Sequence, residues 1–338
     1  MIRPKTAVPA RGPSVPAIGT MPRPVITRLQ TVCLFAAGIR AGTDPAKGTT
    51  EMGFSFNAKD KTVERAVRRI ARERLDASLA HLADATMPRD VLVHELRKNI
   101  KKTRALLRLV RPHFKGYDRE NAALRDAARL VSDLRDADVL AATFDDVASR
   151  IYMPPDALAA LRDRIVRPHT KVADAAAHLA AHGEAIATIA RRAKNWKVSG
   201  AGFDAIEDGL ERSWTAARKA MRMTESDPTG EALHLWRKRV KDHWYHARLL
   251  ARIWPEMMTH HIAAADTLGE TLGEARDLAF LIEALKGEVD ATDLRTRAEE
   301  EETRLLADAR TLGSRFFSEK ESGLSQRWRG WWDVWRGD

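Results

Sequence analysis

The amino-acid sequence predicts an all-α protein from about residue 55 to the C-terminus, on three observations. Apolar residues recur every three to five positions, which is typical of the buried face of a helix, and the first of them are Val63, Val67, Ile70, Leu75, Leu79 and Leu82. No stretch alternates convincingly between apolar and polar residues as a half-buried strand does. Ala, Leu, Arg and Glu dominate the composition, and these residues suit helices.

Residues 1–54 differ in kind, and we expect them to be a disordered or misassigned N-terminal extension. They are rich in Pro and Gly and contain no acidic residue before Asp44. The apolar stretch Val32–Ala37 also fits the centre of a cleaved signal or transit sequence, although it is short and lies far from the N-terminus. A start codon misassigned upstream of Met52 is the other alternative. These interpretations differ in whether residues 1–51 belong to the mature protein.

Proline positions and apolar spacing divide the remainder into helices. Pro88 begins the second helix, since proline is tolerated in a first turn, and Pro112 follows its end at Val110. We expect further helices over residues 117–144, 155–182, 184–194, 202–223, 229–253, 258–286, 290–312 and 318–335. The last helix carries four tryptophans on one face: Trp328, Trp331, Trp332 and Trp335. This spacing favours core packing over stacking on nucleic-acid bases.

The composition indicates attraction to anions without naming the anion. The 338 residues carry a formal net charge of +10 and the isoelectric point is about 9.8, so nucleic acid, acidic lipid and inorganic polyphosphate are all compatible. The single cysteine, Cys33, excludes an intrachain disulfide framework and a cysteine-based zinc cluster. The longest apolar run, Thr31–Ile39, is far shorter than the roughly 20 residues that a membrane-spanning helix needs.

Segments of the sequence repeat at an offset of about 140 residues. The segment His94–Lys101 matches His234–Lys241, and residues 134–140 match residues 275–281. Arg72 and Arg212 each lie twenty-two residues before their histidine, and Arg108 and Arg248 each lie fourteen residues after it. The matches predict a duplicated helical unit, with a first half over about residues 55–195 and a second half over about residues 196–338.

The repeated cations share one helical face. At 100° per residue, His94, Arg97, Lys98, Lys101 and Arg108 fall within about 100° of arc, with Arg104 beside them, opposite Leu96, Ile100, Leu106, Leu107 and Val110. In the second half, a similar face carries His234, Arg237, Lys238, Lys241, Tyr245, Arg248 and Arg252, opposite Trp236, Val240, Ala247 and Leu250. Like charges three or four residues apart repel by a few tenths of a kcal/mol per pair. Two such stripes in the same phase favour a polyanion site over a solvated basic surface.

The histidines fit hydrogen-bond donors better than metal ligands. Cationic neighbours lower the pKa of His94 and His234, so we expect both to be mostly neutral near pH 7 and able to donate to a phosphate oxygen. Neither shares its face with a second histidine. His243 falls among apolar residues and reads as structural, and the pair His260–His261 suggests no role. The sequence has no phosphate-binding Gly-rich loop, no HExxH motif and no nucleophile elbow.

These motifs resemble the CHAD domain, the conserved histidine α-helical domain, over about residues 55–335. The resemblance is carried by His94-Glu-Leu-Arg97-Lys98 with Lys101-Lys102-Thr-Arg104, by residues 134–140, 233–245 and 272–278, and by Leu312-Gly-Ser-Arg-Phe-Phe317 with its Trp-rich helix. It implies two helical bundles related by a pseudo-two-fold axis, with basic helices lining a central channel. It also implies binding of inorganic polyphosphate and association with polyphosphate granules. Some members are fused to a triphosphatase domain, for which this chain has no room, so we expect no enzymatic activity.

On the resemblance and the helical phase together, we expect polyphosphate to contact a set of mostly cationic residues from both halves. They are Arg72, His94, Arg97, Lys98, Lys101, Lys102, Arg104, Arg108, Arg212, His234, Arg237, Lys238, Lys241, Tyr245 and Arg248. Asp242 and Trp244 stand where the first half has Lys102 and Arg104, so we expect the second half to bind the anion less strongly. We expect no metal, no cofactor, no membrane contact and a cytoplasmic location.

Two alternatives stay open. A nucleic-acid-binding helical protein would be favoured by a broad, convex basic face with exposed aromatic residues at its rim. A phosphohydrolase would require Asp136, Asp138 and Asp277 to converge around a divalent metal. Acidic residues beside arginine, as in Arg135-Asp136 and Arg276-Asp277, are more often structural ion pairs.

Overall fold

Eleven α-helices and two short 3-10 helices make up the computed structural model, which describes residues 53–132, 136–166, 175–226 and 229–337. No strand occurs in these ranges, so the predicted all-α class is confirmed. All of these described residues belong to one compact unit. The residues over which we weighed a signal sequence and a misassigned start lie outside the described ranges, as do Arg135 and residues 167–174.

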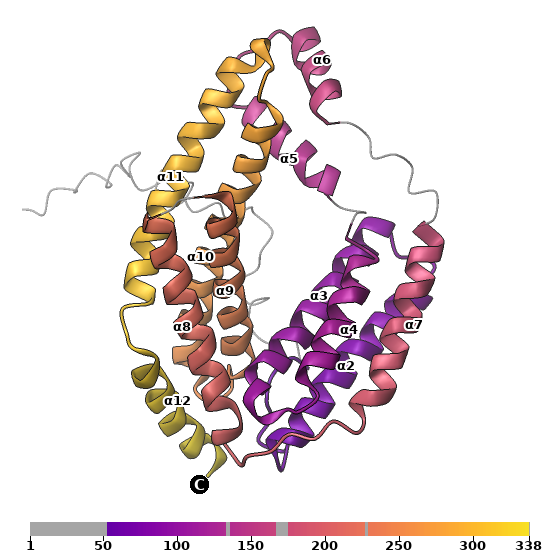
Figure 1. Cartoon of the computed structure of the whole chain (residues 1–338), viewed down its shortest axis with the longest axis vertical. Helices are drawn as coiled ribbons and strands as arrows, with labels where there is room; N and C mark the ends of the chain where they lie inside the picture. Colours follow the sequence, from indigo (N-terminus) through magenta and orange to yellow (C-terminus); the bar gives the residue numbers. More distant parts are fainter. Residues whose placement is uncertain (1–52, 133–135, 167–174, 227–228, 338) are drawn as a thin grey trace, which may run out of the picture. The chain divides into compact units, whose positions relative to one another are not determined.

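Four helices of the first half pack together: α2 (Val63–Ala83), α3 (Arg89–Leu109), α4 (Tyr117–Arg129) and α7 (Ala175–Ala193). Helix α2 contacts α3 and α7, and α4 contacts the same two helices (Figure 1). The start of α2 is fixed by Thr62, whose hydroxyl accepts a hydrogen bond from the backbone N–H of Arg65. Pro88 precedes α3, as the sequence predicts.

The second half contributes five helices: α8 (Asp204–Ser226), α9 (Gly230–Leu249), α10 (Pro255–Ala284), α11 (Thr292–Phe316) and α12 (Glu321–Arg336). They pack in chain order from α8 to α11, and α12 returns to lie against α8. Trp328 and Trp332 on α12 are buried, as their spacing predicts. The 3-10 helices are η2 (Arg111–His113), after α3, and η3 (Val289–Ala291), after α10.

The linking helices α5 (Asp136–Ala148) and α6 (Pro155–Ile165) correct two predictions. We expected continuous helices over residues 117–144 and 155–182, but α4 ends at Arg129 and α6 at Ile165. Helix α5 packs against α10 and α11 of the second half, where Phe144 and Val147 join a separate apolar cluster with Leu278. The break after α4 therefore lets α5 cover the second half, and residues 130–135 contain no Pro or Gly that would signal it. After α6, Pro168 is such a signal, and the predicted helix over residues 155–182 ran through it.

The two halves meet where α3 contacts α8 and α9. At Gly209 of α8 the approach is so close that a Cβ atom would lie 1.8 Å from the carbonyl oxygen of Leu109. His246 of α9 lies at the same contact, with its Nε2 3.0 Å from the carbonyl oxygen of Ala105 on α3. One main apolar cluster includes residues of both halves, so they share a core.

Candidate polyanion-binding site

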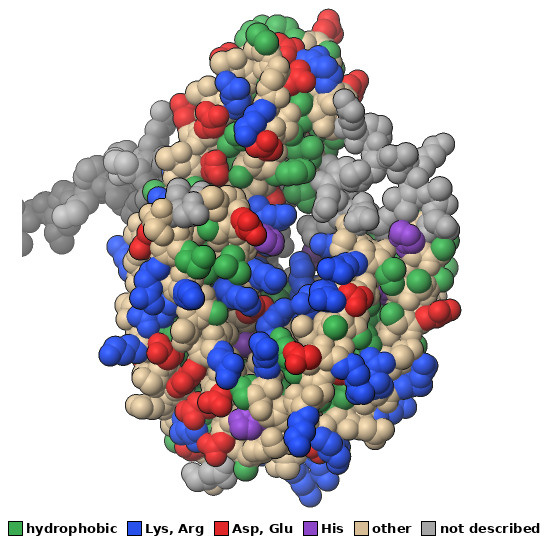
Figure 2. Space-filling model, in the orientation of Figure 1, with side chains coloured by type: hydrophobic (Ala, Val, Ile, Leu, Met, Phe, Trp, Pro, Cys, Tyr) green, Lys and Arg blue, Asp and Glu red, His purple; other side chains and the backbone are tan. Residues whose placement is uncertain are grey.

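The basic helices α3 and α9 are oriented by their apolar faces. The residues that the helical phase assigned to those faces are buried: Leu96, Ile100, Leu106, Leu107 and Val110 on or just after α3, and Trp236, Val240, Ala247 and Leu250 on or just after α9. Because α3 also contacts α9, burial of the two apolar faces leaves cations of both helices near one another. Figure 2 shows Lys and Arg side chains gathered around a hollow between the helices of the two halves.

A cavity of about 360 Å³ opens between α3, α4, α8 and α9. Four of the predicted residues line it, namely Arg104 and Arg108 of the first half and Arg212 and Lys238 of the second. Sequence reasoning missed Arg111 and Arg239, which line it too. Asn121, Tyr117, Ser213, Asp242 and His246 complete the polar part of the wall. The cavity thus collects six cationic side chains from both halves.

Two of the cavity cations, Arg104 and Lys238, lie in an environment that disfavours their charge. Partial burial, and then the nearby guanidinium of Arg108, lower the pKa of Arg104, whose Nε donates to Asn121 Oδ1 at 3.0 Å. Partial burial, and then the charge of Arg239, lower the pKa of Lys238. Lowered pKa values show that the surroundings disfavour the charged forms of both side chains. An anion bound in the cavity would favour the charged forms instead.

One carboxylate compensates part of this charge. Asp242 Oδ1 accepts a hydrogen bond from Arg108 Nη1 at 2.9 Å, and its Oδ2 accepts one from Arg239 Nη1 at 3.1 Å. Arg108 lies on α3 and Arg239 on α9, so Asp242 links the two halves at the cavity wall.

Two cationic side chains of α9, Arg237 and Lys241, pack against glycines of α10. A Cβ atom at Gly273 would be 2.8 Å from Arg237 Nε, and one at Gly269 would be 2.7 Å from Lys241 Cδ. Lys241 Nζ donates to Asp266 at 2.9 Å and to Glu270 at 2.6 Å, both on α10. Although burial alone would raise the pKa of Glu270, the charge and hydrogen bond of Lys241 lower it. Lys241 is therefore already paired with acids of its own half.

Aromatic rings hold three further predicted residues. Lys102 is fully buried, with its Nζ 5.6 Å from the centre of the Phe54 ring. Tyr245 is also buried and meets the same ring edge to face. Arg248 lies over the Trp244 ring at 4.7 Å. Phe54, which we assigned to the extension, is thus part of the core.

The remaining predicted residues lie outside the cavity wall. Arg72 on α2, His94 and Lys101 on α3 and His234 on α9 are exposed. Arg97 and Lys98 on α3 are half-buried, and Lys98 Nζ donates to Glu95 at 2.6 Å. Partial burial, and then the charges of Arg276, Lys238 and Arg237, lower the pKa of His234, in the predicted direction. None of these residues is among those that line the cavity.

The acidic residues of the hydrolase alternative are only partly described. The side chains of Asp136 and Asp138 lie outside the described residues, and Asp277 lies 3.9 Å from Arg276. In the part of the chain that the structure describes, no group of three or more His, Cys, Asp or Glu could hold a metal ion. No described helix is long and apolar enough to cross a membrane.

Comparison with known proteins identifies the family. No match was found among curated proteins. The family model of the CHAD domain matches residues 69–286, which include α3, α9, the cavity-lining residues and the whole of α10. Because this match covers well over half of the sequence and includes both basic helices, the chain belongs to the CHAD domain family.

Proposed function

We propose that this protein binds inorganic polyphosphate without hydrolysing it and is thereby recruited to polyphosphate granules. CHAD domains are linked to polyphosphate binding. The observation that carries the proposal is the cavity between the halves, whose wall combines Arg104, Arg108 and Arg111 with Arg212, Lys238 and Arg239.

The chemistry of the cavity suits a chain of phosphates. Polyphosphate carries about one negative charge per phosphate and has no bases, so it requires closely spaced cations and few other groups. Arginine offers forked N–H donors that can contact two phosphate oxygens together, and five of the six cations are arginines. Exposed cations on α3, such as Lys101, provide contacts beyond the cavity for a longer chain.

Nucleic acid fits this wall less well. Binding of single strands relies on exposed aromatic rings on which bases stack. Among the residues that line the cavity, the ring of Tyr117 is buried and covered by the guanidinium of Arg111, 4.6 Å from the ring centre. We therefore propose nucleic acid as a secondary partner at most.

Calorimetric titration tests the proposal directly. We expect purified protein to bind polyphosphate, and single-stranded and duplex DNA to compete only at much higher concentrations. Incubation with polyphosphate and Mg²⁺ should leave the chain length unchanged on a gel. Stronger binding of DNA, or shortening of the polyphosphate, would contradict the proposal.

A pair of double variants separates the cavity from general charge. Arg104→Gln with Lys238→Gln removes one cavity cation from each half and should weaken binding about tenfold or more. Arg295→Gln with Arg297→Gln removes the same charge from α11, where both arginines pair with neighbouring glutamates away from the cavity. This control should bind nearly as wild type. Equal losses in both would show attraction to net charge alone.

A further inference from the structure

Asp242 is the only carboxylate among the described residues that line the cavity, and it is nearly buried. Its side chain is 9% exposed, against 17% for Arg108 and 33% for Arg239. Its two oxygens accept one hydrogen bond from each of these arginines. Burial lowers the pKa values of Arg104, Lys238 and His246, and the negative charge of Asp242 offsets part of that lowering.

The first half has no carboxylate at the position that corresponds to Asp242. At the offset of 140 residues, α3 has Asn99 and Lys102 where α9 has Arg239 and Asp242. Arg239 and Asp242 lie three residues apart, on the same side of α9, and form an ion pair. The basic helix α9 therefore contributes one acidic side chain, Asp242, to a cavity whose other charged residues are cations.

This acid uses the same donors that a bound phosphate would use. A guanidinium N–H donates to carboxylate and phosphate oxygens with similar geometry. A phosphate that approaches Arg108 and Arg239 must take these donors from Asp242 and then lie beside its charge. Within a few ångströms, in a partly buried site, such repulsion is strong enough to decide which anions bind.

We propose that Asp242 is a built-in competitor for the cavity, which excludes small anions and admits only those that contact several cations together. This inference rests on the proposed function. The carboxylate is tethered to the wall, so its effective concentration exceeds that of a dissolved orthophosphate or sulfate. A polyphosphate segment also meets Arg104, Arg212 and Lys238, and these added contacts outweigh the loss.

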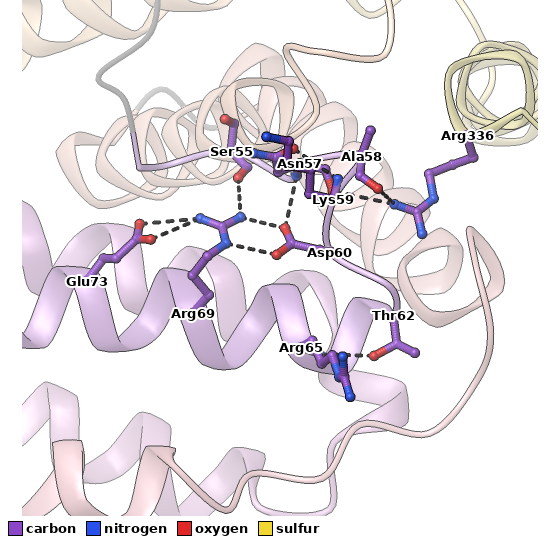
Figure 3. A network of polar contacts seen from close by, with 10 residues as sticks. All are labelled: Ser55, Asn57, Ala58, Lys59, Asp60, Thr62, Arg65, Arg69, Glu73 and Arg336. Atoms are coloured by element: carbon purple, nitrogen blue, oxygen red, sulfur yellow. Dashed lines mark hydrogen bonds and ion pairs between the residues drawn. The ribbon is translucent and has the colours of Figure 1, made fainter.

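The test compares ligands of different length on variants of this residue. Asp242→Asn removes the charge at almost constant size, and Asp242→Ser is a second neutral variant in case the first does not fold. Asp242→Glu keeps the charge. The matched control is Asp60→Asn, because Asp60 also pairs with an arginine, accepting from Arg69 at 2.9 and 2.6 Å, but lies outside the cavity wall (Figure 3).

The neutral variants should bind tripolyphosphate about tenfold more tightly than wild type. They should also bind orthophosphate measurably. Their gain for long-chain polyphosphate should be smaller, because a long chain has alternative positions on cations outside the cavity. Asp242→Glu and Asp60→Asn should keep the wild-type preference for long chains.

The binding of the wild-type protein distinguishes failure of the proposed function from failure of the competitor role. If the wild-type protein does not bind long-chain polyphosphate, the proposed function is wrong. If it binds, and folded neutral variants show an unchanged or weaker affinity for tripolyphosphate, the competitor role alone is wrong. In that case Asp242 only holds Arg108 and Arg239 in place.

Discussion

Two buried histidines of the second half, His243 and His246, and the half-buried His261 lie in largely apolar surroundings. His243 Nε2 lies 2.8 Å from His261 Nε2, among the rings of Trp214, Phe316 and Trp328. His246 contacts Ser213 and the Ala105 carbonyl. Burial lowers the pKa of His246 to about 4 and that of His261 to about 3, and it holds the pKa of His243 well below its usual value. All three are therefore neutral in the folded protein near pH 7.

These lowered pKa values predict a loss of stability in mild acid. Below pH 6.5 the unfolded chain binds protons at these positions and the folded chain does not, so the free energy of unfolding falls until the folded pKa is reached. Each such histidine contributes about 1.4 kcal/mol per pH unit in that window. Urea unfolding at a series of pH values between 7 and 4.5 measures the slope.

Single histidine variants show which residue causes the change of the unfolding free energy with pH. His246→Gln should make the slope shallower by about 1.4 kcal/mol per pH unit between pH 6 and 4.5. The control is His260→Gln on α10, an exposed position, which should leave the slope unchanged. An identical slope in all three proteins would show that His246 is not neutral in the folded state.

At the residue scale, helical phase predicted the site only in part. Arg104, Arg108 and Lys238 follow from it, because they lie opposite the buried apolar residues. Lys102 does not follow from the helical phase. It lies four residues before Leu106, so the two side chains point only about 40° apart around the helix axis, and Lys102 lies on the buried side. Arg111 could not be found by phase at all, because it lies in η2 beyond the end of α3. The pairing of His243 with His261 depends on contact between α9 and α10, which no spacing within one helix reveals.

Among the helices, α8 depends most on a single glycine. Gly209 permits the contact with the end of α3, and Arg212 reaches the cavity less than one turn later on the same helix. Gly209→Ala would place a methyl group against the backbone of Leu109, so α8 must move away. We expect a fall of several degrees in the melting temperature and, in the folded fraction, weaker polyphosphate binding.

Gly330→Ala is the control for this prediction. Gly330 lies inside α12 with no atom near its missing Cβ, so alanine should be neutral or stabilise the helix by about 0.5–1 kcal/mol. A melting temperature of Gly209→Ala equal to that of Gly330→Ala would mean that α3 and α8 are not held this closely.

The prediction of elements used some strong stop signals and overlooked others. Pro88 and Pro112 bound α3, as predicted. Helix α10 begins at Pro255, three residues before the predicted start, and α6 ends before Pro168, through which we had continued the helix over residues 155–182. The end of α4 has no such signal, because Leu130 and Val131 continue the composition of the helix. What ends α4 is tertiary: Val131 is buried against Leu96 and Val93 of α3, while α5 packs on α10. Information of that kind is not present in the local sequence.

For the whole molecule, the cavity formed by both halves predicts a dependence on ligand length. A long polyphosphate contacts cations of both halves, and its second contact is effectively intramolecular. Arg97→Gln with Lys101→Gln should therefore weaken binding of long chains more than that of short oligophosphates, which can remain in the cavity. Titration with length-fractionated polyphosphate provides the measurement.

The matching variant in the second half is expected to do less. Asp242 and Trp244 stand where the first half has Lys102 and Arg104, so the second half offers a ligand fewer cations. Arg237→Gln with Lys241→Gln should cost less affinity than the first-half variant at every chain length. Equal losses at all lengths from both would indicate two independent sites.

Salt gives a check on the whole charge distribution. Binding to a polyanion releases counterions, so affinity should fall steeply between about 50 and 200 mM salt. Arg104→Gln with Lys238→Gln should show a shallower dependence than wild type, since two fewer contacts are made. Affinity that does not change with salt would contradict binding through cations.

The packing of α5 has a consequence for how the chain is made. Its apolar residues Phe144 and Val147 rest on α10 and α11, yet α10 begins at Pro255, more than a hundred residues after α5 ends at Ala148. During synthesis on the ribosome, α5 therefore emerges long before its partners and leaves its apolar surface exposed in the meantime. Contacts of this kind, between distant parts of a chain, form slowly and leave intermediates open to aggregation. A fragment that stops near residue 195 should for this reason need chaperones, or the separately supplied second half, to remain in solution.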